Sequence, residues 1–296
     1  MAHASPAIPL PHLENILFAT DFSPISQGAM PYACAIAKRF GSTLHFVHVI
    51  GPKRMIGPLG ATYADPDGEE ESARRRLSEL TEASPHNHLR NYSVVCRGEI
   101  WDVVSHLASE WNIDLIVVGT HGRHGFKQLM LGSVAEQIFR RAKCPVLTVG
   151  PAASKEGLPF SRFSKILVPT DFSAASKDVL NYAVGMACAN NSTVILFHAI
   201  TEEELETQCG GNLHNAFAEP NARLSELLPD NLGLSREIVV KRGLPAELIV
   251  QSATEAQADL IIMGARRGAS AAAHSPRAIA HVVVCEAPCP VITIGH

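Results

Sequence analysis

The feature that most constrains this chain of 296 residues is an internal repeat that is one domain long. Residues 16–23 read ILFATDFS and residues 166–173 read ILVPTDFS, so the copies begin 150 residues apart. Cys144-Pro145-Val146 returns as Cys289-Pro290-Val291, 145 residues on, so the second copy is five residues shorter in its middle. Solenoid repeats are only about 20–45 residues long. The repeat is therefore a duplicated domain.

The duplication predicts domains at 13–150 and 164–296, a loose tail over 1–12 and a linker at 151–163. The linker sequence PAASKEGLPFSRF has two prolines, a glycine and small polar residues, as domain boundaries commonly do. The tail lacks a basic region before its apolar stretch, which prolines interrupt. It is therefore a poor signal peptide, and we expect a loose tail instead.

Each copy alternates segments with strand and helix character. In the first copy we expect strands at 16–19, 43–50, 92–96, 115–118 and 145–149, and helices at 24–40, 67–83, 100–111 and 134–142. This alternation predicts an α/β fold made of two tandem doubly wound five-stranded parallel-sheet domains of Rossmann-like type. Ligands of such sheets bind beyond the carboxyl ends of the strands, where the strand order reverses. The residues after the first and fourth strands are therefore the site candidates.

After its fourth strand the first copy has a Gly-x2-Gly-x9-Gly-Ser motif, from Gly119 through Gly122 to Gly132-Ser133. Glycine lacks a Cβ and allows a ligand to approach the backbone closely. The motif ends at a predicted helix, whose N-terminal amides and dipole favour an anion. Ser133 would add a hydroxyl donor or simply cap that helix. The motif predicts a site for ribose and polyphosphate, with turn formation without a ligand as the alternative.

Asp21 ends the first strand and should face the same crevice. Its carboxylate would accept hydrogen bonds from ribose hydroxyls or an adenine amine. The alternative is a structural role, as a helix N-cap or in a hydrogen bond at the edge of the core. The second copy keeps this residue as Asp171, which favours the structural role.

The Thr20-Asp21-Phe22-Ser23 segment, the glycine motif and Cys144-Pro145-Val146 give the chain a clear resemblance. It resembles a tandem universal stress protein, of the family with the adenine-nucleotide alpha-hydrolase-like fold, over nearly all of both halves. The resemblance implies ATP binding by the first half, with Mg²⁺ as an additional candidate cofactor, and a role in stress tolerance. It assigns the nucleoside to Asp21 and the main chain near Val49, and the ribose and phosphates to Gly119, Gly122, Gly132, Ser133 and Val134.

The second copy departs from the glycine motif. At the offset of 145 residues, Gly122 becomes Arg267, Gly132 becomes Arg277 and Ser133 becomes Ala278. Long side chains replace two glycines and the hydroxyl is lost, so we expect this half to bind ATP poorly or not at all. An alternative is that Arg266, Arg267 and Arg277 bind a different anion through their charge.

Composition excludes several classes of function. A net charge of −4 and a pI near 6.4 argue against a protein that binds the phosphate backbone of nucleic acid. No apolar run approaches the 18 residues that predict a transmembrane helix, so membrane insertion is not expected. Seven cysteines without a framework spacing suit a reducing compartment, and we expect a cytoplasmic protein.

Catalysis has little support in the sequence. A slow ATPase is the alternative to a non-catalytic regulatory module, but His121 and His124 in the glycine loop have no nucleophile or orienting partner. His281, Cys285 and Cys289 have helical spacing, yet Pro288 and Pro290 would end a helix there, so no zinc site is expected. A third alternative is an interaction protein without nucleotide.

Partners and assembly follow from the duplication. Each copy ends in an apolar strand, 146–149 and 291–294, at what should be a sheet edge. Exposed edges pair readily with other strands. We therefore expect the halves to pack through these strands as an internal pseudo-dimer, with homodimerisation as a further possibility. The expected partners are an adenine nucleotide and a protein that the sequence does not identify.

Overall fold

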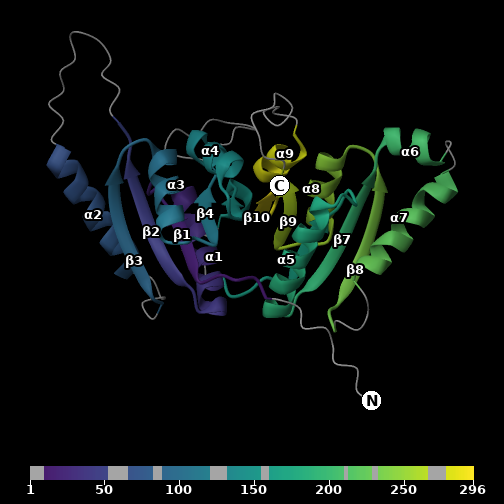
Figure 1. Ribbon diagram of the computed structural model, residues 1–296, viewed down its shortest axis with the longest axis horizontal. Helices are drawn as coiled ribbons and strands as arrows, with labels where there is room; N and C mark the ends of the chain where they lie inside the picture. The colour runs from purple at the N-terminus through teal and green to yellow at the C-terminus, as the bar shows by residue number, and fades with distance from the viewer. Residues whose placement is uncertain are drawn as a thin grey trace, which may run out of the picture.

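The described strands form one ten-stranded sheet, and the two halves lie side by side along it (Figure 1). The structure is a computed structural model that describes residues 10–52, 66–82, 89–120, 132–154, 160–209, 213–228, 233–265 and 278–296. Within these ranges no helix is long and apolar enough to cross a membrane.

The first half follows the order of elements that its sequence predicts, with ends displaced by one residue at several places. Its strands are β1 (Asn15–Ala19), β2 (Thr43–Ile50), β3 (Asn91–Arg97), β4 (Leu115–Gly119) and β5 (Val146–Val149). Its helices are α1 (Pro24–Phe40), α2 (Pro66–Glu82), α3 (Ile100–Glu110) and α4 (Ser133–Arg141), and a 3-10 turn, η1 (Pro151–Ala153), follows β5.

The second half corrects the expectation that both copies have the same order of strands and helices. Its strands are β6 (Lys165–Pro169), β7 (Thr193–Ile200), β8 (Arg236–Arg242), β9 (Leu260–Ala265) and β10 (Val291–Gly295). Its helices are α5 (Ala175–Asn190), α6 (Glu202–Cys209), α7 (Leu213–Leu227), α8 (Pro245–Glu255) and α9 (Ile279–Glu286). Two helices, α6 and α7, therefore stand between β7 and β8, where the repeat predicted one.

The strand order is β3-β2-β1-β4-β5-β10-β9-β6-β7-β8. Neighbouring strands are parallel within each half, whereas β5 and β10 pair antiparallel, with Thr148 opposite Val291 and Val146 opposite Thr293. The two threonine hydroxyls also donate across this junction, from Thr148 to the Val291 carbonyl and from Thr293 to the Val146 carbonyl. The predicted pairing of the terminal strands is confirmed, and it turns two five-stranded sheets into one.

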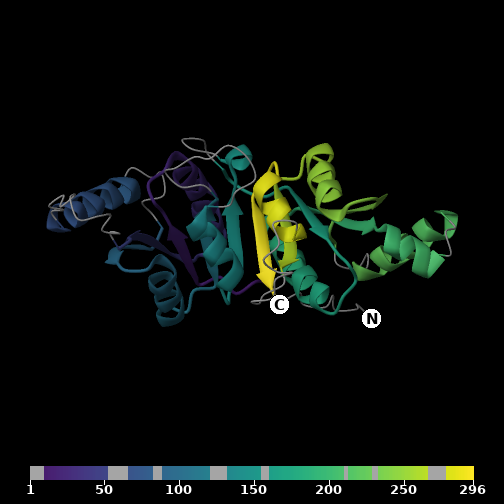
Figure 2. The ribbon, with the colours of Figure 1, turned by 90° about the horizontal axis from the view of Figure 1, so that it is seen from above.

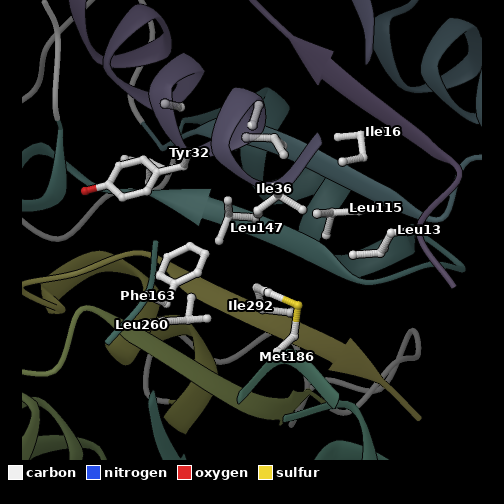
Figure 3. Packing of buried hydrophobic residues seen from close by; sticks show 14 of the residues in the cluster. Leu13, Ile16, Tyr32, Ile36, Leu115, Leu147, Phe163, Met186, Leu260 and Ile292 are labelled. Atoms are coloured by element: carbon white, nitrogen blue, oxygen red, sulfur yellow. The ribbon is translucent and has the colours of Figure 1, made fainter. Parts of the chain in front are cut away.

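Helices cover both faces of the sheet, as Figure 2 shows from above. The side chains of α1, α2, α5 and α7 enter one buried cluster, and those of α3, α4, α8 and α9 enter another on the opposite face. Both clusters run through the two halves without a break. Figure 3 shows Leu147 of β5 and Ile292 of β10 in the first of them, near Phe163 from the segment that joins the halves.

Local signals explain where α1 and α2 lie. Ser23 caps α1 by accepting the amide of Ser26, Pro24 takes the first helical position, and Gly41 ends the helix with φ of 71°. The charged helix α2 is less exposed than its composition suggests, because Ala73 and Leu77 dock it on the core. Ala153 and Phe163, near the two ends of the segment that joins the halves, are buried.

Candidate functional site

A cavity opens at the carboxyl ends of β1 and β4, where the strand order reverses. It encloses about 620 Å³ of space, including open solvent at its mouth. Five of the seven predicted site residues line it: Asp21, Val49, Gly119, Gly132 and Val134. Gly122 lies outside the described residues, as do His121 and His124. Ser133 is the first residue of α4, and its side chain is not among those described.

The turn after β1 places Asp21 at the cavity. Its Oδ1 atom accepts the Ser23 amide at 2.9 Å, and the Thr20 hydroxyl accepts the Phe22 amide at 3.0 Å. Ser23 is the N-cap of α1, so the alternative of Asp21 as that cap is wrong. Burial alone would raise the pKa of Asp21, but hydrogen bonds from Ser23 and Ser26 outweigh it and lower the pKa. The side chain is therefore an ionised acceptor at neutral pH.

Gly119 lines the cavity, but its lack of a side chain is explained by packing. A Cβ on this residue would lie 2.9 Å from the backbone N and Cα of Ser26. Those atoms belong to the first turn of α1 and cannot move aside without moving the helix. The glycine is therefore required for close approach of β4 to α1, whether or not a ligand binds.

The N-terminus of α4 forms another wall. Gly132 is its N-cap, with φ of −57° and ψ of 143°, so the alternative of Ser133 as the cap is wrong. The Gly132 amide donates to the Thr120 carbonyl. The amides of the first helical turn have no acceptor within the helix itself, and Val134 and Ala135 in this turn line the cavity. The nearby Glu136 carboxylate pairs with Arg140 at 2.6 Å. This end of the cavity is thus suited to an anion.

An apolar wall completes the cavity, and sequence reasoning did not find it. It consists of Val47 on β2, Ile100 and Val104 on α3, and Val118 on β4. These side chains look like ordinary core residues in the sequence. The sheet order is what brings them together, opposite the polar turn of Asp21. An apolar face beside a few polar groups is the usual composition of a small-molecule site.

The second half differs at the corresponding place in its described residues. Phe197 takes the position of Val47 and Met263 that of Val118, and both larger side chains are buried. Asp171 accepts both the Ser173 amide and the Ser176 hydroxyl. Burial opposes these bonds, yet they lower the pKa of Asp171 to about 2. Arg266, Arg267 and Arg277 lie outside the described residues.

A metal centre finds no support in the described part of the chain. No group of three or more His, Cys, Asp or Glu side chains that could hold a metal occurs there. His281 and Cys285 do meet on α9, with Nε2 and Sγ 3.8 Å apart. The helix ends at Glu286, before Cys289, so the helical spacing does not continue to the third residue.

Comparison with known proteins identifies the family. The universal stress protein family matches residues 12–150 and again residues 162–295. The chain belongs to this family. Universal stress protein A homolog 1 of Coxiella burnetii is 38% identical over 47% of this chain and 96% of its own length.

Some relatives match this chain across both of its halves. Universal stress protein Rv2623 of Mycobacterium tuberculosis is 26% identical over 85% of this chain and 86% of its own length. A universal stress protein of Archaeoglobus fulgidus has the same fold, with a TM-score of 0.72 at 20% identity, over 95% of this chain and 98% of that one. Another family member, 22% identical over 45% of this chain and 98% of its own (TM-score 0.35), was solved in complex with cAMP.

Proposed function

We propose that this universal stress protein is a non-catalytic regulatory module whose first half binds ATP in the cavity at β1 and β4. The observation that carries the proposal is the convergence of Asp21, Gly132 and Val134 on one cavity with an apolar wall. Asp21 and the main chain at Val49 would take the nucleoside, and the apolar wall would pack against the base. Gly119, Gly122, Gly132, Ser133 and Val134 would serve the ribose and phosphates.

The phosphates would meet the first turn of α4, where amides and helix dipole favour negative charge. Within the described residues, Asp21 is the one carboxylate in the cavity wall, and its Oδ1 already accepts the Ser23 amide. Mg²⁺ bound with ATP would therefore be coordinated mainly by phosphate oxygens. Binding would alter a surface that a protein partner reads, and this is the route by which the module would act in stress tolerance.

The proposal gives the second half a minor role in binding. Phe197 and Met263 would take up the space that Val47 and Val118 leave open in the first half. We therefore expect one ATP per chain.

Equilibrium dialysis of the full chain against ATP tests the proposal. We expect one bound nucleotide and at least roughly ten-fold weaker binding, or about 1.4 kcal/mol, in two variants. Gly132→Arg introduces the residue of the second copy at a backbone φ that any residue adopts. Val47→Phe introduces the aromatic ring of the second copy into the apolar wall. Thermal unfolding of each variant separates lost binding from lost fold.

Two further measurements distinguish the alternatives. A mass spectrum of small molecules that co-purify with the protein identifies the bound nucleotide directly. Phosphate release above the level of the Gly132→Arg variant would favour the slow ATPase instead. Absence of any adenine-nucleotide binding by the wild-type chain would reject the proposal and leave the interaction protein.

A further inference from the structure

The turn after β1 is held from both faces of the sheet. Asp21 lines the cavity beside α3 and α4, whereas the next residue, Phe22, is buried in the cluster beneath α1 and α2. Phe22 has φ of 61°, a conformation that bulky residues rarely adopt. Neighbouring contacts must therefore hold this backbone in place.

Among the described residues, an imidazole and a guanidinium lie against the Phe22 ring. The His48 imidazole lies 4.4 Å from its centroid, and the His48 Nδ1 donates to the Thr20 carbonyl at 2.8 Å. The Arg76 guanidinium carbon lies 4.3 Å from the same centroid, over the ring. Arg76 comes from α2, and no described residue of this helix, Arg76 included, lines the cavity. We call Phe22, His48 and Arg76 the Phe22 clamp.

The second half contains the same arrangement. Phe172 has φ of 58°, the His198 ring lies 4.6 Å away, and the Arg223 guanidinium lies 3.9 Å from the Phe172 centroid. The His198 Nδ1 donates to the Thr170 carbonyl at 2.9 Å.

The arginines do not follow the 150-residue offset of the turn, because Arg76 and Arg223 are 147 residues apart. The two arginines nevertheless lie on equivalent helices, because α2 precedes β3 and α7 precedes β8, and each places a guanidinium over the strained phenylalanine of its own copy. The contact is present in both copies although the segment between the turn and the helix differs in length, which argues that the turn requires the clamp.

We propose that the Phe22 clamp positions the Asp21 turn for binding and couples occupancy of the cavity to α2. The ligand in this proposal rests on the proposed function. A turn that is held in its binding geometry in advance loses less conformational freedom when the ligand binds. Coupling is reciprocal, so a ligand that fixes Asp21 also stabilises the Arg76 contact and the helix that carries it. The outer surface of α2 is then the surface that changes with nucleotide.

The first test needs no ligand. The Ser23 amide, which donates to Asp21, reports the order of the turn through its hydrogen exchange, measured by NMR. Arg76→Met removes the charge and keeps much of the side-chain length, on an exposed residue. We expect faster exchange at Ser23 and no change at Ser173. Arg223→Met is the matched control and should give the reverse. Unchanged Ser23 exchange in Arg76→Met overturns the clamp.

The second test adds ATP. A cation over an aromatic ring at an exposed site is equivalent to about two- to five-fold in affinity, so Arg76→Met should weaken ATP binding by up to this factor. Arg76→Lys, which keeps the cation, should restore most of the affinity, and Arg223→Met should bind as wild type does. ATP should also slow amide exchange along α2 and leave α7 unchanged.

The outcomes separate the two proposals. Equal ATP affinity of Arg76→Met and wild type, or α2 exchange that is indifferent to bound ATP, overturns the coupling. Failure of the wild-type chain to bind ATP rejects the proposed function and with it the coupling to nucleotide. The Ser23 exchange measurement then still decides whether the clamp positions the turn.

Discussion

The Tyr32 hydroxyl donates a hydrogen bond to the Ala153 carbonyl at 2.7 Å, which ties α1 to the turn after β5. Tyr182 occupies the corresponding position on α5, and its buried hydroxyl has no hydrogen-bond partner in the part of the chain that the structure describes. Burial raises the pKa of both phenols, so both are neutral at physiological pH. Two equivalent tyrosines thus differ in whether a buried hydroxyl is satisfied.

This difference predicts opposite effects of the same substitution. Tyr32→Phe leaves the buried Ala153 carbonyl without its donor and should lower the free energy of unfolding by about 1–3 kcal/mol. Tyr182→Phe removes an unsatisfied hydroxyl and should be neutral or stabilising by up to about 1 kcal/mol. Urea denaturation of both variants checks this. Equal destabilisation by the two substitutions would contradict the hydrogen-bond explanation.

Gly119 and Gly264 form a second matched pair. Gly119→Ala would bring a methyl group to 2.9 Å from the Ser26 backbone, whereas Gly264→Ala would meet the His296 side chain at 3.1 Å. A side chain can rotate away but a helix backbone cannot, so we expect Gly119→Ala to cost about 1–3 kcal/mol and Gly264→Ala clearly less. Thermal unfolding measures both. A Gly119→Ala variant as stable as wild type would show that α1 can shift.

The elements of the first half could be predicted from sequence because their signals are local. Ser23 and Gly41 encode the two ends of α1, and the apolar strands stand out in composition. The split into α6 and α7 was missed because the first copy served as the template. A local signal was available there. Thr201 and Glu204 form a reciprocal capping box, with each backbone amide donating to the other side chain.

The sequence could predict the polar and glycine part of the candidate site, but not its apolar wall. The glycine motif and Asp21 carry an unusual pattern, whereas Val47 and Val118 are indistinguishable from core residues until the sheet order is known. The reason for a glycine at position 119 could also be found only in the structure. The backbone that leaves no room for a Cβ belongs to Ser26, which is far away in the sequence.

Buried thiols should resist alkylation. Burial, together with the nearby Asp259 carboxylate, raises the pKa of Cys289 to about 12, and its side chain is only 5% exposed. The thiolate is the reactive form, so iodoacetamide at about pH 8 should spare Cys289 in the folded protein and modify it in urea. Peptide mass spectrometry follows the reaction, with the less buried Cys285 as an internal comparison. Labelling of Cys289 as fast as Cys285 in the folded state would contradict this.

Asp171 should make the free energy of unfolding depend on pH in the acid range. Burial would raise its pKa, but the hydrogen bonds from Ser173 and Ser176 lower it to about 2, below the ordinary value of about 3.9 in an unfolded chain. A depressed pKa stabilises the folded state above the unfolded value, and this contribution is lost as pH falls from about 4 to about 2. The carboxylate is exposed to solvent, so the effect should be small.

Removal of one donor tests this directly. Ser176→Ala should move the pKa of Asp171 up toward its ordinary value, which carboxyl carbon NMR titration measures. The variant should be less stable than wild type at about pH 6. The difference should shrink as pH falls toward about 2.5, because the folded variant, with its higher Asp171 pKa, takes up a proton there before wild type does. Ser26→Ala is the matched variant in the first half, where the Ser26 hydroxyl is shared with Thr20 and the Ser23 carbonyl. It should raise the pKa of Asp21 in the same direction. The explanation is contradicted if Asp171 of the wild-type protein titrates at its ordinary pKa. The Ser173 amide and the Ser176 hydroxyl would then not stabilise the carboxylate when the protein is in solution.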